Sequence, residues 1–225
     1  MRVVVTREAG YNDSLRAWLS IDDVVDEVPL TTTAFVDDAS IEASVAALVE
    51  RNIRYLVVTS ARAARGAQIA SRLLSVPVLS VGAATSAALE SRGVVVSGEG
   101  ESAVDVARRI EAGPVLSLGA RDTRPELAGE LATRGIESVH VACYETNVVA
   151  LTDEQCETLR RADAVLIGAP SAWEVARADV RAETWVVVPG ATTRDTVLAS
   201  HERVLEGWGP DLATRLADLA VEREQ

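Results

Sequence analysis

The sequence contains no lysine, so all 22 of its basic residues are arginines. Without lysine the protein can form neither a Schiff base with a carbonyl substrate nor a nucleotide-binding phosphate loop. The 34 acidic residues outnumber the arginines, and the net charge is −12. Nucleic-acid binding normally needs a basic face, so the composition argues against nucleic acid as a partner. It is typical of a solvated acidic surface.

Cysteine, histidine and long apolar runs are also scarce. Two cysteines, Cys143 and Cys156, are too few for a disulfide framework in a chain of 225 residues. With two distant histidines, His140 and His201, they do not make a zinc site. No segment reaches the roughly 18 apolar residues that span a bilayer, and residues 1–7 are too short for a signal peptide. We therefore expect a reduced, cytoplasmic protein with no metal and no membrane partner.

Short apolar runs alternate with helix-length amphipathic segments, which is the pattern of βα units around a parallel sheet. The expected strands are rich in valine, as strands buried on both faces are. They span Val3–Thr6, Val24–Val28, Tyr55–Thr59, Val76–Val81, Val94–Ser97, Val115–Leu118, Val139–Tyr144, Ala164–Ile167, Thr184–Val188 and Arg203–Leu205. The segment Gly98–Gly100 is expected to be a loop.

Capping residues mark several helices between these strands. Thr152 and Gln155 have the spacing of a capping box at the start of Asp153–Arg161. The other expected helices are Ser14–Leu19 (capped by Asn12 or Asp13), Ile41–Arg51 (capped by Ser40), Ala172–Ala178 (capped by Ser171) and Asp211–Val221 (preceded by Pro210).

Two extended stretches, residues 28–36 and 141–150, are too long for ordinary strands. They are explained if the chain crosses twice between two lobes. We predict an α/β fold with two Rossmann-like (flavodoxin-like) lobes, each with a parallel sheet, joined by a two-stranded hinge. Lobe one is discontinuous and comprises residues 1–33 and 148–225, and lobe two, residues 34–147, is the insertion.

Each expected lobe carries a strand–Ser/Thr–helix turn and then a strand–Gly–x–x–Thr–helix turn. Ligands of open α/β sheets bind outside the carboxyl ends of the strands, where helix starts attract carboxylates and phosphates. Such turns can hold an anion in an acidic protein, and we expect them to face a cleft between the lobes. The alternative is that each hydroxyl only caps its own helix. The turn residues are Ser60, Gly82, Thr85, Ser171, Gly190, Thr192 and Thr193.

Arginines that follow strands could add bidentate contacts to carboxylates, or could simply lie on the surface. They are Arg7, Arg62, Arg121 and Arg124. Tyr144, midway along the second crossing, is the titratable group best placed to face a cleft. The alternative for Tyr144 is a hinge residue that packs against the other crossing. The two histidines are expected to serve packing or the surface, and no dinucleotide fingerprint or nucleophile elbow is present.

The order and spacing of these segments resemble the uroporphyrinogen-III synthase family over nearly the whole chain. The matching segments are residues 3–7, 57–60, 81–93, 116–119, 124–127, 131–135, 141–146, 163–167, 170–172 and 190–193. The resemblance implies an enzyme that closes the linear tetrapyrrole hydroxymethylbilane with inversion of the last pyrrole ring and loss of water. It also implies a two-lobed frame, no cofactor and no metal, and a reaction through an azafulvene cation and a spiro intermediate.

Several residues match family positions one by one. Tyr144 matches a tyrosine proposed to assist departure of the hydroxyl, which makes it the expected catalytic residue. The expected substrate-binding residues are Thr6, Arg7, Thr59, Ser60, Arg62, Gly82, Thr85, Ser171, Thr192 and Thr193. The chain departs from the family at Gly168–Ala169, where Thr-Ser is usual, and at Ala61–Ala63, where an asparagine is commoner.

Two other functions remain open from the sequence. The lost hydroxyl gives some support to a non-catalytic module that binds a tetrapyrrole or another polyanion on the same fold. A nucleotide-sugar or phosphate-handling enzyme would need a phosphate loop or metal-binding carboxylates, and neither is evident.

Overall fold

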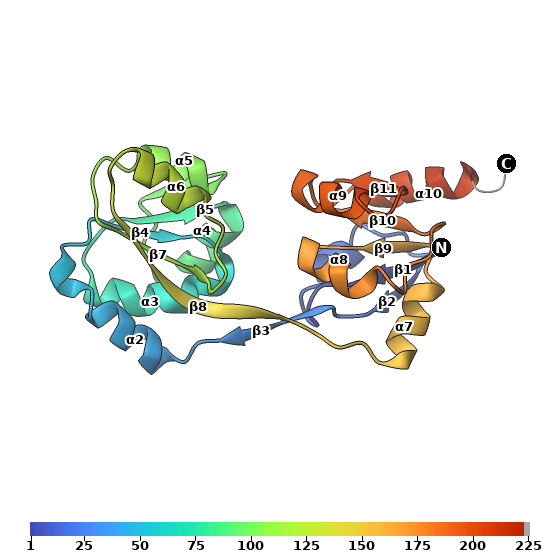
Figure 1. The fold of residues 1–225 in the computed structure, drawn as a ribbon, viewed down its shortest axis with the longest axis horizontal. Helices are drawn as coiled ribbons and strands as arrows, with labels where there is room; N and C mark the ends of the chain where they lie inside the picture. The colour runs from blue at the N-terminus through green and yellow to red at the C-terminus, as the bar shows by residue number, and fades with distance from the viewer. Residues whose placement is uncertain (223–225) are drawn as a thin grey trace. The chain divides into compact units, whose positions relative to one another are not determined.

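The computed structural model describes residues 1–222, and the chain divides into two compact units. Unit one comprises residues 1–32 and 147–225, and unit two comprises residues 33–146. Each unit contains its own sheet, with helices packed on both faces (Figure 1). This is the α/β architecture with two parallel-dominated sheets that the sequence predicts. Within the described part of the chain, none of the helices is both long and apolar enough to cross a membrane.

Unit one has a five-stranded parallel sheet in the order β11-β10-β9-β1-β2. Numbered along this unit alone, the order is 2-1-3-4-5, which is that of flavodoxin-like folds. Its elements are β1 (Arg2–Val5), α1 (Asp13–Arg16), β2 (Val24–Glu27), α7 (Asp153–Arg160), β9 (Ala164–Leu166), α8 (Pro170–Ala176), β10 (Trp185–Val188), α9 (Ala191–Leu198), β11 (Val204–Glu206) and α10 (Leu212–Glu222).

The strands of unit one bury alternate residues against opposite layers of helices. Val4 packs with residues of α7, α8 and α9, whereas Val3 and Val5 pack with Leu15 of α1 and Leu212 of α10. All three valines are fully buried. Strands covered on both faces need apolar side chains in both directions, which explains the continuous valine runs in the sequence.

Unit two has a six-stranded sheet in the order β3-β8-β7-β4-β5-β6. The five strands from β8 to β6 are parallel, and numbered along the unit they have the Rossmann order 3-2-1-4-5. Its elements are β3 (Thr31–Phe35), α2 (Asp38–Ala46), the short 3₁₀ helices η1 (Val49–Arg51) and η2 (Ala61–Ala63), β4 (Tyr55–Val58), α3 (Ala64–Leu73), β5 (Val78–Val81), α4 (Ala83–Glu90), β6 (Gly98–Gly100), α5 (Ala103–Arg109), β7 (Val115–Ala120), α6 (Glu126–Thr133) and β8 (Ser138–Val148).

The two extended stretches form the neighbouring strands β3 and β8, beside each other in the sheet (Figure 1). The Val36 amide donates to the Cys143 carbonyl at 3.0 Å, and the Val149 amide donates to the Leu30 carbonyl at 3.0 Å. Residue numbers rise on one strand as they fall on the other, so the two segments run antiparallel. The chain passes between the units along this pair, as expected for a two-stranded hinge.

The sixth strand of unit two differs from the sequence prediction. Val94–Ser97 forms no strand, and Gly98–Gly100, expected to be a loop, pairs with β5 as β6. Close packing explains the glycines, because a Cβ on Gly100 would lie 2.8 Å from Val106 Cγ2 and one on Gly98 would lie 3.1 Å from Leu79 Cδ2. The strand therefore forms where the backbone can approach its neighbours, and β propensity alone misplaces it.

Three predicted helix starts also differ from the structure. Asp37 caps α2, and its carboxylate accepts the amide of Ser40, the expected cap, at 2.9 Å. Ser171 lies inside the first turn of α8, after Pro170. Asn12 stands at the start of α1, but its amide donates to the Arg7 carbonyl at 3.2 Å and caps nothing. The capping box at Thr152 and Gln155 is confirmed.

Candidate functional site

A cavity of about 490 Å³ lies in unit two at the carboxyl ends of the parallel strands. Thr59 follows β4, Val81 ends β5, Ala120 ends β7 and Tyr144 lies on β8, and all four line the cavity. Strands β4 and β7 are neighbours although they are not consecutive, so the strand order reverses between them. Ligands of doubly wound sheets bind at such a switch point, and the volume is within the usual range for ligand pockets.

Tyr144 is 7 % exposed and lies in the core cluster of α2, α3 and β4. Its ring contacts Phe35 of β3, with centroids 6.4 Å apart and planes at 52°. The interpretation that Tyr144 packs against the other crossing is therefore confirmed, and the same side chain lines the cavity of unit two. Aromatic packing of this kind fixes the ring, so the phenol presents its hydroxyl in a defined place.

Thr59 donates its hydroxyl hydrogen to the Leu118 carbonyl, with Oγ1 at 3.2 Å. Thr6 of unit one has the same arrangement, since Oγ1 donates to the Leu166 carbonyl at 2.6 Å. Each threonine follows the first strand of its unit's parallel sheet and bridges to the neighbouring strand at the switch point. A hydroxyl that donates to a carbonyl can offer only its lone pairs to a ligand. Thr6 is 2 % exposed, whereas Thr59 lies on the cavity.

The charged residues around the cavity are three carboxylates and one guanidinium. Glu101, Asp122, Glu126 and Arg124 all line it, and Arg124 is exposed. In the part of the chain that the structure describes, none of the four takes part in an ion pair. Arg124 is therefore the one side chain of this cavity that can neutralise a bound carboxylate.

Two helices begin at the rim of the same cavity. Ser102 caps α5 in a capping box with Asp105, and Pro125 precedes α6. Glu101 and Ser102 are not among the site residues predicted from the sequence, because Gly98–Gly100 was expected to be a loop. The Ser-x-x-Asp spacing before an apolar segment was the signal that could have placed a helix start there.

The Gly–x–x–Thr turns lie after β5 and after β10. Gly82 precedes α4 with φ 79° and ψ 148°, a backbone conformation that essentially only glycine adopts. Thr85 and Thr193 are each the third residue of their helices, and each is 4 % exposed. Thr192 is exposed at the start of α9. Gly190 has an extended backbone that any residue adopts, so only Gly82 of the two is required by conformation.

The other predicted residues occupy the turns after their strands. Ser60 caps η2, and Arg62 follows it at the end of β4. The guanidinium of Arg7 lies 5.7 Å from the centre of the Trp208 ring. Ser171 is exposed in the first turn of α8. The structure thus brings Thr59 and Tyr144 together at one cavity and distributes the rest along the carboxyl edges of the two sheets.

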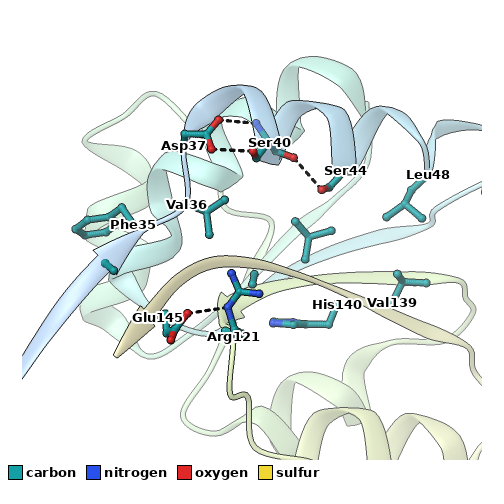
Figure 2. A pocket seen from close by; sticks show the side chains of 13 residues that line it. Phe35, Val36, Asp37, Ser40, Ser44, Leu48, Arg121, Val139, His140 and Glu145 are labelled. Atoms are coloured by element: carbon teal, nitrogen blue, oxygen red, sulfur yellow. Dashed lines mark hydrogen bonds and ion pairs between the residues drawn. The ribbon is translucent and has the colours of Figure 1, made fainter. Parts of the chain in front are cut away.

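A larger cavity of about 760 Å³ lies between α2 and β8 (Figure 2). Its polar side chains are already paired with one another or with the backbone. Arg121 Nε donates to Glu145 at 2.9 Å, and the Ser40 hydroxyl donates to Asp37 at 2.7 Å. These hydrogen bonds from Ser40 hold the pKa of Asp37 below its usual range. His140 Nε2 lies 2.8 Å from the Ala120 carbonyl and therefore carries the proton. Most of these polar groups have a partner within the protein, whereas the smaller cavity is lined by Arg124, which has no ion pair in the described part of the chain, and by Thr59 and Tyr144 at the switch point, so we take the smaller cavity as the candidate site.

Neither cysteine suits nucleophilic or metal chemistry. Cys143 is 2 % exposed, and burial raises the pKa of its thiol to about 11. Burial and the hydrogen bond to Asp179 also raise the pKa of Cys156. Both are free thiols, and within residues 1–222 no three histidine, cysteine or acidic side chains gather as metal ligands do.

A comparison with protein families matches residues 24–201 to the model for uroporphyrinogen-III synthase HemD. The chain belongs to the uroporphyrinogen-III synthase family. The family is a lyase family of tetrapyrrole biosynthesis, and this chain closes the linear tetrapyrrole hydroxymethylbilane into uroporphyrinogen III with loss of water.

Solved structures of uroporphyrinogen-III synthases have the same fold. A selenomethionine mutant form from Thermus thermophilus superposes with a TM-score of 0.66 at 15% identity, covering 100% of this chain and 99% of that one. The enzyme from Helicobacter pylori gives 0.65 at 16% identity, covering 99% and 100%. No curated protein sequence matches the chain significantly. At such identities the structures establish the two-lobed fold, and the family match carries the activity.

Proposed function

We propose that part of hydroxymethylbilane binds in the cavity of unit two and that its hydroxyl group leaves beside Tyr144. The observation that carries this proposal is the place of Tyr144, which lines the cavity with Thr59 at the switch point of the sheet. The other side chains that line the cavity supply charge and hydrogen bonds, and no thiol, amine or imidazole is among them. Positioning and electrostatics therefore carry the catalysis.

The chemistry assigned to Tyr144 is general acid catalysis. Its phenol donates a proton to the hydroxymethyl oxygen, the carbon–oxygen bond breaks and water leaves. The pyrrole carbon becomes part of a delocalised cation, and the phenolate keeps the matching negative charge. The carboxylates of Glu101 and Asp122 lie on the same cavity and stabilise positive charge that develops there.

The polar groups of the cavity bind different groups of the substrate. Thr59 has already given its hydrogen to Leu118, so it accepts a hydrogen bond from a pyrrole N–H. Arg124 binds a substrate carboxylate in bidentate geometry. The acidic side chains repel the remaining carboxylates and so direct them to Arg124 and to backbone N–H groups. The further substrate-binding residues that we propose are Thr6, Arg7, Ser60, Arg62, Gly82, Thr85, Ser171, Thr192 and Thr193.

We also propose that the enzyme works as a cytoplasmic monomer. Its net charge of −12 favours a soluble monomer, and its free thiols suit a reducing compartment. Light scattering during size-exclusion chromatography measures the oligomeric state, and a stable dimer at micromolar concentration would contradict the monomer.

The test of the proposed site is Tyr144→Phe, assayed by separating the type I and type III isomers made from freshly generated hydroxymethylbilane. Loss of one general acid lowers kcat by about 10²-fold or more, while positioning keeps the enzyme faster than the spontaneous reaction. Tyr55→Phe is the matched control, because Tyr55 lies at the opposite end of β4. Equal activity in wild type and Tyr144→Phe would remove Tyr144 from the mechanism.

A further inference from the structure

Strand β8 carries a bulge directly before Tyr144. In its pairing with β7, Gly119 lies opposite Ala142 and Ala120 lies opposite Tyr144, so Cys143 is the extra residue. A regular strand points successive side chains to opposite faces. Here Cys143 and Tyr144 are both buried, at 2 % and 7 % exposure, in the same core cluster. The bulge therefore turns Tyr144 away from the direction that simple alternation would give it.

The bulge residue sits on a glycine of helix α3. A Cβ added to Gly66 would overlap the Cys143 sulfur and would lie 3.4 Å from its Cβ. Gly66 is buried within the helix, where glycine is disfavoured relative to alanine. Its φ is not positive, so the backbone itself does not require glycine. Glycine is required at position 66 because the Cys143 sulfur occupies the space that a Cβ would fill.

We propose that Gly66 and Cys143 are positioning residues for Tyr144. The glycine forms a socket in α3, the sulfur fills it, and the bulge is thereby held where Tyr144 faces the cavity and packs on Phe35. The inference rests on the proposed role of Tyr144 in the reaction. Bulges beside active sites commonly change the direction in which a side chain points. Here Gly66 of α3 is the residue that holds the bulge in place, through its contact with Cys143.

The packing of Cys143 against Gly66 can be tested with substitutions that add a methyl group on the helix, remove the sulfur from the strand, or do both. Gly66→Ala crowds the sulfur, Cys143→Ala leaves the socket empty, and the double variant Gly66→Ala/Cys143→Ala fills it again from the helix side. The chain has three tyrosines, so protein labelled with 3-fluorotyrosine gives three ¹⁹F resonances, and Tyr144→Phe identifies one of them. The ¹⁹F shift reports the surroundings of Tyr144 independently of turnover.

We expect each single variant to shift or broaden the Tyr144 resonance and to lower kcat about 3- to 10-fold, with KM changed less than about twofold. The double variant should return both readouts to within about twofold of wild type, because neighbouring changes of this kind are not additive. Gly129→Ala in α6 is the matched control, since a Cβ there meets nothing within 4 Å. It should leave the Tyr144 resonance and kcat unchanged.

The proposal that Gly66 and Cys143 position Tyr144 is wrong if the Tyr144 resonance is unchanged in both single variants. It is also wrong if the resonance remains shifted in the double variant. If Gly66→Ala does not fold, Cys143→Ala alone decides the matter, and an unchanged resonance there has the same meaning. Unchanged turnover in Tyr144→Phe would instead overturn the proposed catalytic role. The ¹⁹F result would still show whether Gly66 and Cys143 position the Tyr144 ring, because it does not depend on turnover.

Discussion

Arg124 is the one guanidinium of a cavity that three carboxylates also line, and its removal should weaken binding of a polycarboxylate substrate. Arg124→Gln deletes the charge and keeps much of the side-chain length. A charge-assisted hydrogen bond is worth about 1.5–3 kcal/mol when shielded from water, and an exposed ion pair about 0.2–1 kcal/mol. Because Arg124 is exposed before substrate covers it, we expect a loss of about 1–2 kcal/mol.

This loss corresponds to a ~5- to 30-fold fall in kcat/KM, carried mainly by KM. The assay measures the initial rate of type III isomer formation at several concentrations of fresh hydroxymethylbilane, at low and high salt. The wild-type KM should rise with salt, and the KM of Arg124→Gln should depend on salt less, because its ion pair is absent. Arg124→Lys keeps the positive charge but cannot make the bidentate contact, so its kcat/KM should lie between the values of wild type and Arg124→Gln.

Arg72→Gln is the matched control for Arg124→Gln. Arg72 is also exposed, lies on α3 of the same unit and does not line the cavity. It makes the same change in net charge, so it separates a local contact from the general field of the protein. Equal kcat/KM in wild type and Arg124→Gln, or equal losses in Arg124→Gln and Arg72→Gln, would refute the contact with substrate.

Three further predictions depend on single contacts. A Cβ on Gly119 would overlap the Thr59 hydroxyl. Gly119→Ala should therefore lower the free energy of unfolding, measured in urea, by about 1–3 kcal/mol. The same substitution should cost less in a Thr59→Ala protein, because the hydroxyl that the new methyl group meets is then absent. Thr192→Val should weaken equilibrium binding of the uroporphyrinogen product by about 1.5–3 kcal/mol, which is the worth of one hydrogen bond from its exposed hydroxyl to a carboxylate. The folded pKa of Cys143 is raised from 9.0 to about 11, so the folded state holds this proton longer than the unfolded chain. Stability should therefore fall by about 2–3 kcal/mol between pH 9 and pH 11, and Cys143→Ala should remove this part of the pH dependence of urea unfolding.

The sequence predicted the parts of the fold that depend on local chemistry. Valine runs indicated strands buried on both faces, and Thr152 with Gln155 indicated a helix start. Gly82 was correctly placed at the turn before α4, where its positive φ requires glycine. These features need only neighbouring residues, so a single sequence is sufficient to find them.

Features that depend on contacts between distant segments were missed. Strand β6 forms at Gly98–Gly100 because α5 packs closely over it, and no local propensity indicates this. The bulge at Cys143 exists only in the pairing of β8 with β7. For the same reason no pattern in the chain identifies Glu101 and Asp122 as neighbours of Tyr144 on one cavity.

The most direct test of the assigned activity is the identity of the product that the purified protein makes from hydroxymethylbilane. The bilane is generated fresh, incubated with and without protein, oxidised to porphyrin and separated into isomers. We predict that type III predominates with the protein and type I without it. Type I alone in both samples, from a protein that is folded by circular dichroism, would contradict the assignment.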